Sequence, residues 1–350
     1  MSTQNKKIGV IGVGSFGTAI ANLLALNGID TLWYSRQPAL VQKIKDTRQH
    51  NGITISDHIE PTDDLEKIAT TCDLIFPIIP SKNFRALMQE LGPYLQPYHI
   101  LIHGTKGFGL RNFHEEALLF KETTLTRDNV CTMSEVIRQE SVVVRIGCLA
   151  GPNLASEILG GQPTATVIAS PFTEVIKKGK GLLNSRQFHV FGSHELLGTE
   201  LAGALKNVIA IGSGILGGMG LGKNIQAMLI TRGLTEMIHI GSALGTEARA
   251  FLGTAGIGDL IATATSQDSR NYTFGMRLGK GEDLESIMES MPELAEGVRT
   301  LKIVRQLAKY YKLHVPITEM LYNVVFEAFD RNRALHYLMK YPYAVDVDFM

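Results

Sequence analysis

The sequence predicts an α/β protein with two domains: a doubly wound sheet at the N-terminus, then an all-α domain. Three observations support this. A glycine-rich turn follows the first apolar segment, short apolar segments then alternate with helical patterns, and strand patterns stop at about His194. With 350 residues the chain is long enough for two domains, which we place at residues 1–192 and 193–350.

In the first domain, strands are expected at the short apolar segments Lys7–Ile11, Thr31–Tyr34, Asp73–Ile79, His99–His103, Ser141–Leu149, Thr164–Ser170 and Gln187–Phe191. Helical patterns lie between them at Thr18–Leu26, Pro38–Gln49, Asn83–Leu95 and Phe172–Leu183. This alternation indicates a parallel sheet with helices on both faces. The polar stretch Gly109–Gln139 is expected to be a partly helical surface excursion.

In the second domain, long helical patterns cover Gly198–Leu216, Asn224–Leu244, Asn271–Gly279, Val298–Tyr311 and Ile317–Phe329. The segment Leu201–Leu221 is long enough to span a bilayer. Because it contains Lys206, Asn207 and six glycines, a buried core helix and its exit are the better interpretation. No membrane span is expected.

The bulk composition excludes several classes of partner. Lys and Arg total 34, as do Asp and Glu, so no net charge favours nucleic acid or an anionic membrane, although a local basic pocket for a small anion remains open. The cysteines, Cys72, Cys131 and Cys148, are far apart and form no CxxC motif. This favours a reduced, cytoplasmic setting without a zinc site or disulfides.

The turn Gly12-Val13-Gly14-Ser15-Phe16-Gly17 has the pattern G-x-G-x-x-G between a predicted strand and a predicted helix. Gly12 and Gly14 permit a tight turn and the approach of a pyrophosphate, and Gly17 lets the helix pack on the strand. The free N–H groups at the helix start favour the same anion. A Rossmann-type site for a nicotinamide or flavin dinucleotide is therefore expected, the alternative being a structural glycine turn.

The end of the second strand refines the choice of cofactor. NAD-specific sites usually carry an acid near this point, whereas an arginine suits the 2′-phosphate of NADP. The chain reads Leu32-Trp33-Tyr34-Ser35-Arg36, with no acid at the strand end. This favours NADP over NAD, and the alternative is that Arg36 is an ordinary solvated arginine.

Lys206 is the only charged residue of the apolar segment Leu201–Leu221. A buried ammonium group is costly unless it is paired, and burial lowers the pKa of a lysine toward the range where it exchanges protons. Lysine suits proton transfer better than arginine, which stays charged. The alternative is a lysine that snorkels from an amphipathic helix.

A cluster of small and polar residues lies between two helical patterns, from Gly256 to Asn271. In it, Arg270 offers a planar donor fork for a phosphate, Asn271 adds amide donors, and Asp259 could balance the charge of Lys206. The alternative is an ordinary helix start capped by Ser269.

The segment Gly217–Lys223 matches the G-x-x-x-x-G-K part of a nucleotide-triphosphate loop. The next residue, Asn224, lacks the hydroxyl that would hold Mg²⁺, and no strand pattern precedes the glycines. A turn between two core helices is therefore expected instead of a kinase or ATPase site.

Taken together, these motifs resemble the bacterial type of NAD(P)-dependent glycerol-3-phosphate dehydrogenase. The matching stretches occur in order along nearly the whole chain: IGVIGVGSFGTAIA, LWYSR, HGTKG, AGPNLASEI, LAGALKNVIAIGSGI, GLGKNIQAMLITRGLTEM, GIGDLIATATSQDSRNYTFG, AEGVRT and PITEMLYNVVFE. Two positions depart from the family's usual residues. Phe16 stands where tryptophan is frequent, and Asn153 replaces a frequent serine or threonine.

The resemblance implies roles for individual residues, with Lys206 as the proton acceptor. Besides the turn glycines, the implied dinucleotide contacts are Ser15, Phe16, Arg36, Lys106, Ala155, Arg270, Leu294 and Glu296. The implied substrate contacts are Lys106, Gly151, Asn153, Lys206, Asp259, Ser269, Arg270 and Asn271.

The resemblance also implies the reaction: reversible reduction of dihydroxyacetone phosphate to sn-glycerol 3-phosphate with NADP or NAD, which supplies glycerol phosphate for phospholipid synthesis. The apolar helices of the second half are compatible with a homodimer. Two other interpretations stay open at this point. One is a dehydrogenase of the 3-hydroxyacid or 6-phosphogluconate type, which also combines a Rossmann-type domain with a helical one, and the other is a dinucleotide sensor without catalysis.

Overall fold

A computed structural model describes residues 7–113, 125–291 and 295–340. The chain forms two compact units. Unit 1 comprises Met1–Gly109 and Thr132–Leu196, and unit 2 comprises Leu110–Cys131 and Leu197–Met350, each as far as its residues are described. The sequence-based boundary after residue 192 did not foresee that the segment Leu110–Cys131 groups with unit 2.

Unit 1 is built on an eight-stranded sheet in the order β12-β11-β10-β7-β6-β1-β2-β5. The strands are β1 (Ile8–Ile11), β2 (Thr31–Tyr34), β5 (Ile59–Thr62), β6 (Leu74–Pro77), β7 (Ile100–His103), β10 (Arg145–Ala150), β11 (Thr164–Ala169) and β12 (Phe188–Ser193). The chain runs from β1 outward to β5 and then returns to the other side of β1 with β6. This reversal is the switch point at which doubly wound sheets bind ligands, beyond the carboxyl ends of the strands.

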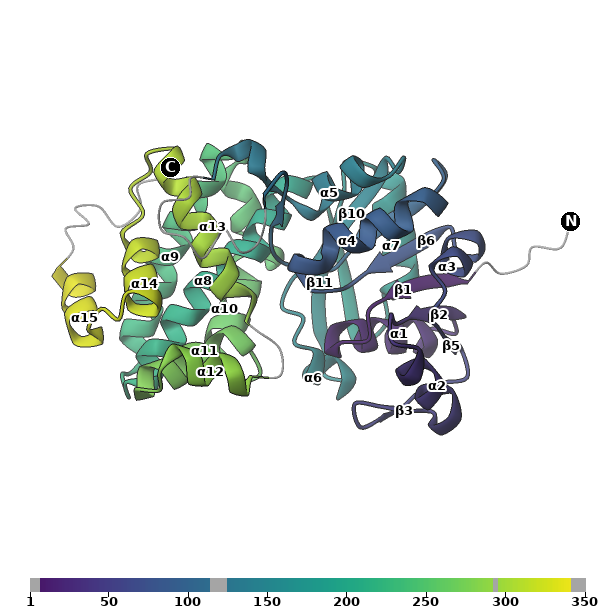
Figure 1. Cartoon of the computed structure of the whole chain (residues 1–350), viewed down its shortest axis with the longest axis horizontal. Helices are drawn as coiled ribbons and strands as arrows, with labels where there is room; N and C mark the ends of the chain where they lie inside the picture. Colours follow the sequence, from purple (N-terminus) through teal and green to yellow (C-terminus); the bar gives the residue numbers. More distant parts are fainter. Residues whose placement is uncertain (1–6, 114–124, 292–294, 341–350) are drawn as a thin grey trace, which may run out of the picture. The chain divides into compact units, whose positions relative to one another are not determined.

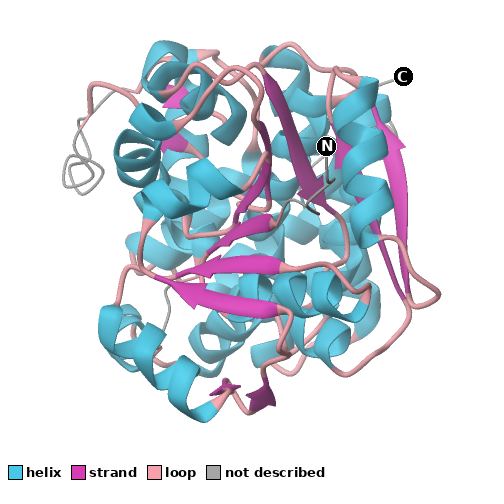
Figure 2. Ribbon diagram, turned by 90° about the vertical axis from the view of Figure 1, so that its right-hand side faces the viewer, coloured by secondary structure: helices cyan, strands magenta, loops and turns pink. Residues whose placement is uncertain are grey.

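Helices cover both faces of the sheet (Figures 1 and 2). On one face α1 (Ser15–Leu26) contacts α7 (Thr173–Leu183), and on the other α3 (Leu65–Thr71), α4 (Ser81–Leu91) and α5 (Met133–Glu140) contact one another in turn. Two further helices, α2 (Pro38–Thr47) and α6 (Ala155–Leu159), complete unit 1. On the face covered by α1 and α7, the apolar strands and helices bury a core that includes Val10, Leu24, Trp33 and Phe76. The predicted fold class is confirmed.

Two local predictions in unit 1 need correction. The sheet is not wholly parallel, because β10 and β11 pair antiparallel. The helix expected to reach Gln49 ends at Thr47, and the hairpin of β3 (Gln49–His50) and β4 (Ile53–Thr54) follows it. Its turn, Asn51-Gly52, has φ angles of 48° and 76°, the left-handed geometry that a two-residue hairpin requires.

The excursion expected at Gly109–Gln139 is partly helical in its described residues, as predicted, but it does not lie wholly at the surface. Leu125, Val130, Cys131 and Met133 are at most 2% exposed, because the apolar side chains of this stretch are spaced so that they can pack inward. Val130–Cys131 forms β9, which pairs with β8 (Gly109–Leu110), and α5 follows. Residues 114–124 lie outside the described part of the chain.

Unit 2 is mostly helical. Its helices are α8 (Leu196–Gly218), α9 (Lys223–Ala243), α10 (Asp259–Thr265), α11 (Arg270–Lys280), α12 (Leu284–Ser290), α13 (Glu296–Tyr310), α14 (Pro316–Phe326) and α15 (Arg331–Lys340). Among the described helices, α8 is the one long and apolar enough to cross a membrane. However, 89% of its most apolar 18-residue stretch is buried inside the protein. As expected for a core helix, α8 ends at the glycines before α9, so the segment that resembles a triphosphate loop is a turn between helices.

Paired glycines bring α8 and α11 into backbone contact. A Cβ atom at Gly214 would lie 2.1 Å from the carbonyl oxygen of Tyr272, and one at Gly275 would lie 2.0 Å from that of Ile211. Gly218 and Gly279 meet the opposite helix in the same way one turn later. Only residues without a side chain permit this approach. The crossing fixes α11, and with it Ser269, Arg270 and Asn271, relative to the helix that carries Lys206.

Candidate functional site

In unit 1, candidate residues gather at the carboxyl edge of the parallel strands. The glycine turn follows β1, Arg36 follows β2, Lys106 follows β7 and Gly151 follows β10. Because the parallel strands share one direction, these four segments come to the same edge of the sheet although they are distant in sequence. This edge includes the switch point between β1 and β6.

The glycine turn has the geometry that a dinucleotide requires. Gly12 has φ 121°, and a Cβ atom there would lie 2.1 Å from the carbonyl oxygen of Ile78. A Cβ atom at Gly17 would lie 2.2 Å from the carbonyl oxygen of Gly12, so α1 packs directly on the turn. Gly14 is the N-cap of α1 and Ser15 its first residue, and no side chain caps this helix start. The first N–H groups of the helix can therefore bind a phosphate.

Two residues that the sequence did not reveal hold the turn in place. Trp33 Nε1 donates a hydrogen bond of 2.9 Å to the carbonyl oxygen of Gly12, and His50 Nε2 lies 2.8 Å from that of Val13. The two rings meet edge to face, 5.3 Å apart. These contacts bind carbonyl oxygens of the turn and so favour its N–H groups as the face offered to an anion. The Asn51-Gly52 hairpin signal could have located His50.

Other predicted dinucleotide contacts of unit 1 lie around this turn. Phe16 is half-buried, and its ring would meet a Cβ atom placed on Gly104 at 2.9 Å. Arg36 is exposed directly after β2, where no acidic residue stands. Ala155 is the first residue of α6. Whether they contact a cofactor stays a prediction.

Lys106, Gly151 and Asn153 are brought together. Lys106 Nζ donates a hydrogen bond of 2.9 Å to the carbonyl oxygen of Gly151, which has φ 144°, a conformation that favours glycine. Two residues later, Asn153 Nδ2 donates a hydrogen bond of 2.9 Å to Thr166 Oγ1 on β11. Thr166 is a residue of this cluster that the sequence did not single out.

In unit 2, Lys206 is only 4% exposed, in the middle of α8. Its ammonium group donates hydrogen bonds to Asp259 Oδ1 and to Thr263 Oγ1. Asp259 is 1% exposed, so the expected ion pair is present and both members are buried. A buried pair of this kind holds the amine at one position within an apolar core.

The local fold explains how Asp259 and Thr263 reach Lys206. Asp259 begins α10, and Thr263 lies four residues later on the same face of that helix. A π-helical turn, Thr254–Gly258, leads directly into α10. Its Gly256 lies so close to Phe251 that a Cβ atom would come 2.0 Å from the carbonyl oxygen. Such π-turns often occur at functional sites.

The start of α11 has the helix cap that the structural interpretation expects, and the phosphate-binding interpretation stays a prediction. Ser269 Oγ accepts a hydrogen bond of 3.3 Å from the backbone N–H of Tyr272, so this serine caps the helix. Arg270 is exposed at the first helical position. The side chain of Asn271 is buried and connects two elements, since Nδ2 donates to Asn207 Oδ1 (2.9 Å) and Oδ1 accepts from the N–H of Gly297 (2.8 Å).

Glu296, one of the predicted dinucleotide contacts, is the first residue of α13 and precedes Gly297. The Asn207–Asn271–Gly297 hydrogen bonds therefore fix the start of α13 to the neighbour of Lys206. Leu294 lies outside the described residues.

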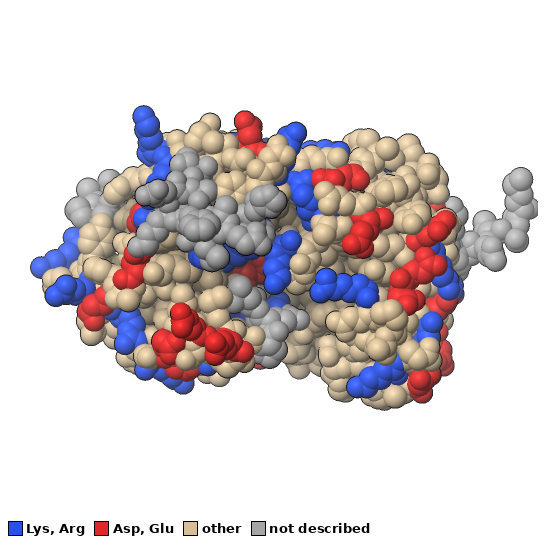
Figure 3. Space-filling model, in the orientation of Figure 1, with Lys and Arg blue, Asp and Glu red and all other residues tan. Residues whose placement is uncertain are grey.

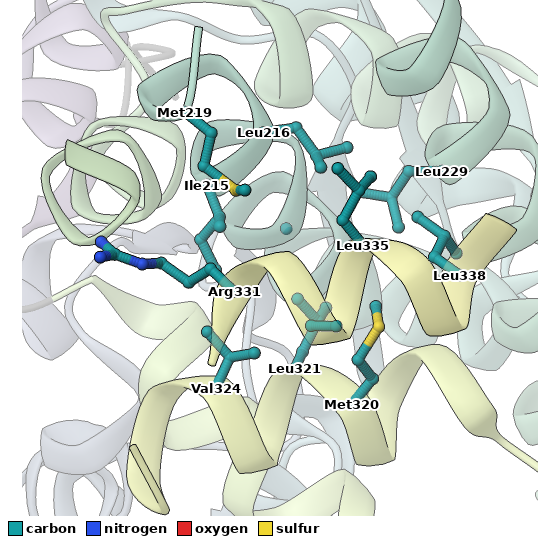
Figure 4. Close-up of a pocket in the computed structure, with 12 residues that line it drawn as sticks. Ile215, Leu216, Met219, Leu229, Met320, Leu321, Val324, Arg331, Leu335 and Leu338 are labelled. Carbon is teal, nitrogen blue, oxygen red and sulfur yellow. The ribbon is translucent and has the colours of Figure 1, made fainter. Parts of the chain in front are cut away.

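A pocket in unit 2 is lined by none of the candidate site residues (Figure 4). It encloses about 340 Å³ of empty space, partly open to solvent, between α8, α9, α14 and α15. Its lining is apolar except for Arg331, whose guanidinium donates to the carbonyl oxygens of Leu278 and Gly279. No residue of its lining is suited to proton transfer. We interpret the pocket as imperfect core packing around α15.

The charge distribution is mixed. On the face drawn in Figure 3, basic and acidic side chains are interspersed, in keeping with the zero net charge of the chain. Within residues 7–113, 125–291 and 295–340, no three His, Cys, Asp or Glu side chains are close enough to hold a metal ion.

Comparison with protein families gives matches over most of the chain. A model described as NAD-dependent glycerol-3-phosphate dehydrogenase N-terminus matches residues 7–176. A second, described as NAD-dependent glycerol-3-phosphate dehydrogenase C-terminus, matches residues 195–336. The two matches cover the sheet of unit 1 except β12, and most of the helices of unit 2.

Individual relatives agree with this. The chain is 37% identical over 350 residues to a glycerol-3-phosphate dehydrogenase [NAD(P)+] of Teredinibacter turnerae, and 38% identical over 352 residues to one of Pseudomonas aeruginosa strain PAO1. Each alignment covers 99% of this chain and 98% of the relative. A crystal structure of glycerol-3-phosphate dehydrogenase from Coxiella burnetii matches with a TM-score of 0.85 and 28% identity, covering 96% of this chain and 99% of that one.

Proposed function

The chain belongs to the NAD-dependent glycerol-3-phosphate dehydrogenase family, and we propose that Lys206 is the proton donor and acceptor of its reaction. The protein is an NAD(P)-dependent oxidoreductase that acts on glycerol 3-phosphate. The family matches favour this activity over the 3-hydroxyacid and 6-phosphogluconate types. A dinucleotide sensor would have no use for a buried amine.

The buried Lys206–Asp259 pair is the observation that carries the proposal. Reduction of the C2 carbonyl of dihydroxyacetone phosphate places negative charge on its oxygen, which must take up a proton to give sn-glycerol 3-phosphate. The reduced nicotinamide supplies the hydride when it is bound. Protonated Lys206 can stabilise the developing alkoxide and then donate the proton from Nζ, and neutral Lys206 can accept it in the reverse direction.

Asp259 and Thr263 would act through Lys206. Their oxygens accept from its ammonium group and hold Nζ in position, so the amine is already oriented before substrate arrives. Asp259 also balances the positive charge of the protonated amine, which is the form needed for reduction.

The residues of unit 1 fit a dinucleotide. The close approaches at Gly12 and Gly17 leave room for backbone but not for side chains, as a pyrophosphate site requires. We infer that Gly12, Gly14, Ser15, Phe16 and Gly17 hold the pyrophosphate and neighbouring groups. The remaining contacts to the dinucleotide would be made by Lys106, Ala155, Arg270, Leu294 and Glu296. The exposed guanidinium of Arg36 supports a preference for NADP over NAD.

We infer that the phosphate of the substrate is bound by Arg270, whose exposed position at the start of α11 adds the positive end of that helix. The rest of the substrate would be surrounded by Ser269, Asn271, Lys106, Gly151 and Asn153. Part of the role of Asn271 would be structural, because its side chain binds Asn207 and Gly297.

The cellular setting is also a proposal. Cys72, Cys131 and Cys148 are buried and form no disulfide bond within the described residues, which is consistent with a reducing cytoplasm. Because sn-glycerol 3-phosphate is the backbone of phospholipids, supply of that backbone is the expected role. A homodimer is the expected assembly, and sedimentation velocity would test it.

Lys206→Ala tests the assignment of the proton donor. Since general acid–base catalysis contributes about 10²–10⁴-fold, kcat with dihydroxyacetone phosphate should fall by about that factor, while NADPH still binds, as followed by its fluorescence. Lys223→Ala, which removes an exposed lysine at the start of α9, is the matched control and should leave kcat unchanged. Turnover of Lys206→Ala within a few-fold of wild type would refute the role of Lys206.

A further inference from the structure

The hydrogen bonds of Thr166 determine which way the neighbouring Asn153 amide faces. Thr166 is fully buried on β11, and its hydroxyl donates a hydrogen bond of 3.0 Å to the carbonyl oxygen of Ala150. A hydroxyl has one proton to donate, so toward Asn153 it can act only as an acceptor. The Nδ2 group of Asn153 must therefore be the atom that faces Thr166, at 2.9 Å. With the amide reversed, two oxygens would face each other without a proton between them.

This orientation leaves Asn153 Oδ1 without a partner. The atom is shielded from solvent and accepts no hydrogen bond within the described part of the chain. A buried carbonyl oxygen without a donor is unfavourable, and native structures tolerate one mainly where function requires it. The oxygen is therefore a vacant acceptor whose direction is set by a second residue.

The position of this acceptor indicates what would fill it. Residues 151–154 leave the carboxyl end of β10, and Lys106 Nζ binds the carbonyl oxygen of Gly151 only two residues away. Because β11 runs antiparallel to β10, its first residues reach this same edge of the sheet. The vacant acceptor thus lies at the edge that carries the glycine turn and Lys106.

We propose that Asn153 Oδ1 is reserved for an uncharged hydrogen-bond donor of the bound ligands, and that Thr166 is the positioning residue that reserves it. On the proposed function, the donor is either the free hydroxyl of the three-carbon substrate or the carboxamide N–H₂ of the nicotinamide. A phosphate dianion, the main form of a phosphate monoester at neutral pH, presents only acceptors and does not fit. The groups that cover Oδ1 must give way when the ligand enters.

Two pairs of ligands test the proposal, each differing by one donor. Dihydroxyacetone phosphate is compared with hydroxyacetone phosphate, which lacks the free hydroxyl. NADPH is compared with its 3-acetylpyridine analogue, in which a methyl group replaces the amide nitrogen. Since one hydrogen bond contributes about a factor of ten, wild type should prefer the intact ligand by about tenfold in kcat/KM beyond any intrinsic difference, in at least one pair.

The variants locate the effect. Thr166→Val, which keeps the shape of the side chain but not its hydroxyl, and Asn153→Ala should each reduce that preference several-fold. Thr166→Ser, which keeps the hydroxyl, should retain it, and circular dichroism should show that all three variants are folded. If the variants change the preference between the two substrates, the donor is the hydroxyl. If they change the preference between the two cofactors, the donor is the carboxamide.

Preferences that are the same in wild type, Thr166→Val and Asn153→Ala for both pairs would overturn the proposal. A wild-type protein that turned over no ketone phosphate would refute the proposed function instead. The same comparison would then be made with the dissociation constants of each ligand pair, so the two failures are distinguishable.

Discussion

On our proposal, Arg270 binds the phosphate end of the substrate, away from the reacting carbonyl. Arg270 is the first residue of α11, next to the Ser269 cap, whereas Lys206, the proposed proton donor, is on α8. Binding energy at a remote phosphate orients the carbonyl, so its loss should appear mainly with phosphorylated substrate.

Arg270→Ala should therefore lower kcat/KM for dihydroxyacetone phosphate by about 10²-fold or more, as expected for a charge-assisted bidentate contact. Reduction of unphosphorylated dihydroxyacetone should change little. Steady-state assays with both ketones measure the two ratios. Arg277→Ala, on the same helix but paired with Glu282, is the matched control. Equal losses with both ketones would show that Arg270 does not bind the phosphate.

Glu236 is a buried acid that the proposed reaction does not use. It is 3% exposed on α9, and its carboxyl group accepts hydrogen bonds from the N–H groups of Ile317 and Thr318 and from the Thr318 hydroxyl. Burial raises its pKa from 4.5 to about 7, against the opposite effect of those hydrogen bonds. The carboxyl group thus caps the start of α14.

The raised pKa fixes the sign of a stability effect. Because the folded state favours the protonated acid, this contribution is fully present below pH 4.5 and is lost as the pH rises through about 7. Between these two limits, the contribution of Glu236 to the free energy of unfolding changes by about 3 kcal/mol. Urea unfolding from pH 4.5 to 8.5 should therefore show wild type losing about that much free energy relative to Glu236→Gln, which cannot titrate. Parallel curves for the two proteins would contradict the assignment.

Residues whose chemistry conflicts with their surroundings were the easiest to find in the sequence. Lys206 stands out because a charge interrupts an apolar segment, and Asp259 was expected as its partner. Thr166, Trp33 and His50 are ordinary residues of strands, and only their pairing in space gives them a role. No pattern within β11 reports that the Thr166 hydroxyl faces Asn153.

At the scale of elements, the α8–α11 crossing depends on glycine. Gly275→Ala would place a Cβ atom 2.0 Å from the backbone oxygen of Ile211, where no flexible side chain can yield. The helices must separate, and we expect the free energy of unfolding to fall by about 1–3 kcal/mol or more. Chemical unfolding followed by circular dichroism measures this.

Gly181→Ala is the control for this prediction. Gly181 lies within α7 with no atom near the position of a Cβ, so alanine there should stabilise the protein by about 0.5–1 kcal/mol through the helix propensity alone. If the two substitutions changed the free energy of unfolding equally, Gly275 would not be required for the close approach of α8 and α11.

The sheet shows which elements the sequence could predict. Seven of its strands were expected, because an uninterrupted apolar segment between helical patterns indicates a buried strand. β5 was missed, since Pro61 interrupts a short segment that forms the sheet edge. The antiparallel direction of β11 was also missed, because a strand has the same apolar periodicity in both directions. The helices that precede and follow β11 in the sequence also suggested parallel connections.

At the scale of the whole molecule, the sequence indicated a sheet-based half and a helical half because the periodicity changes near residue 194. It could not show that the segment Leu110–Cys131 groups with unit 2, since membership in a unit depends on contacts between residues far apart in the chain. Each unit buries its own apolar core, centred on the sheet in one case and on α8 in the other.

Two separate cores imply that a ligand of one unit need not stabilise the other equally. If the dinucleotide binds mainly at the glycine turn, NADPH at 100 times its dissociation constant should stabilise unit 1 by about 2.7 kcal/mol. Backbone amides of β1, β2 and β6 that exchange through opening of unit 1 should then exchange about 100-fold more slowly. Amides in the centre of α8 and α14 should change much less until glycerol 3-phosphate is added, since Lys206 and Arg270 belong to unit 2. Hydrogen exchange followed by mass spectrometry resolves these segments. NADP⁺ with and without glycerol 3-phosphate supplies the second comparison, and equal slowing in both units with dinucleotide alone would show that they open as one cooperative structure.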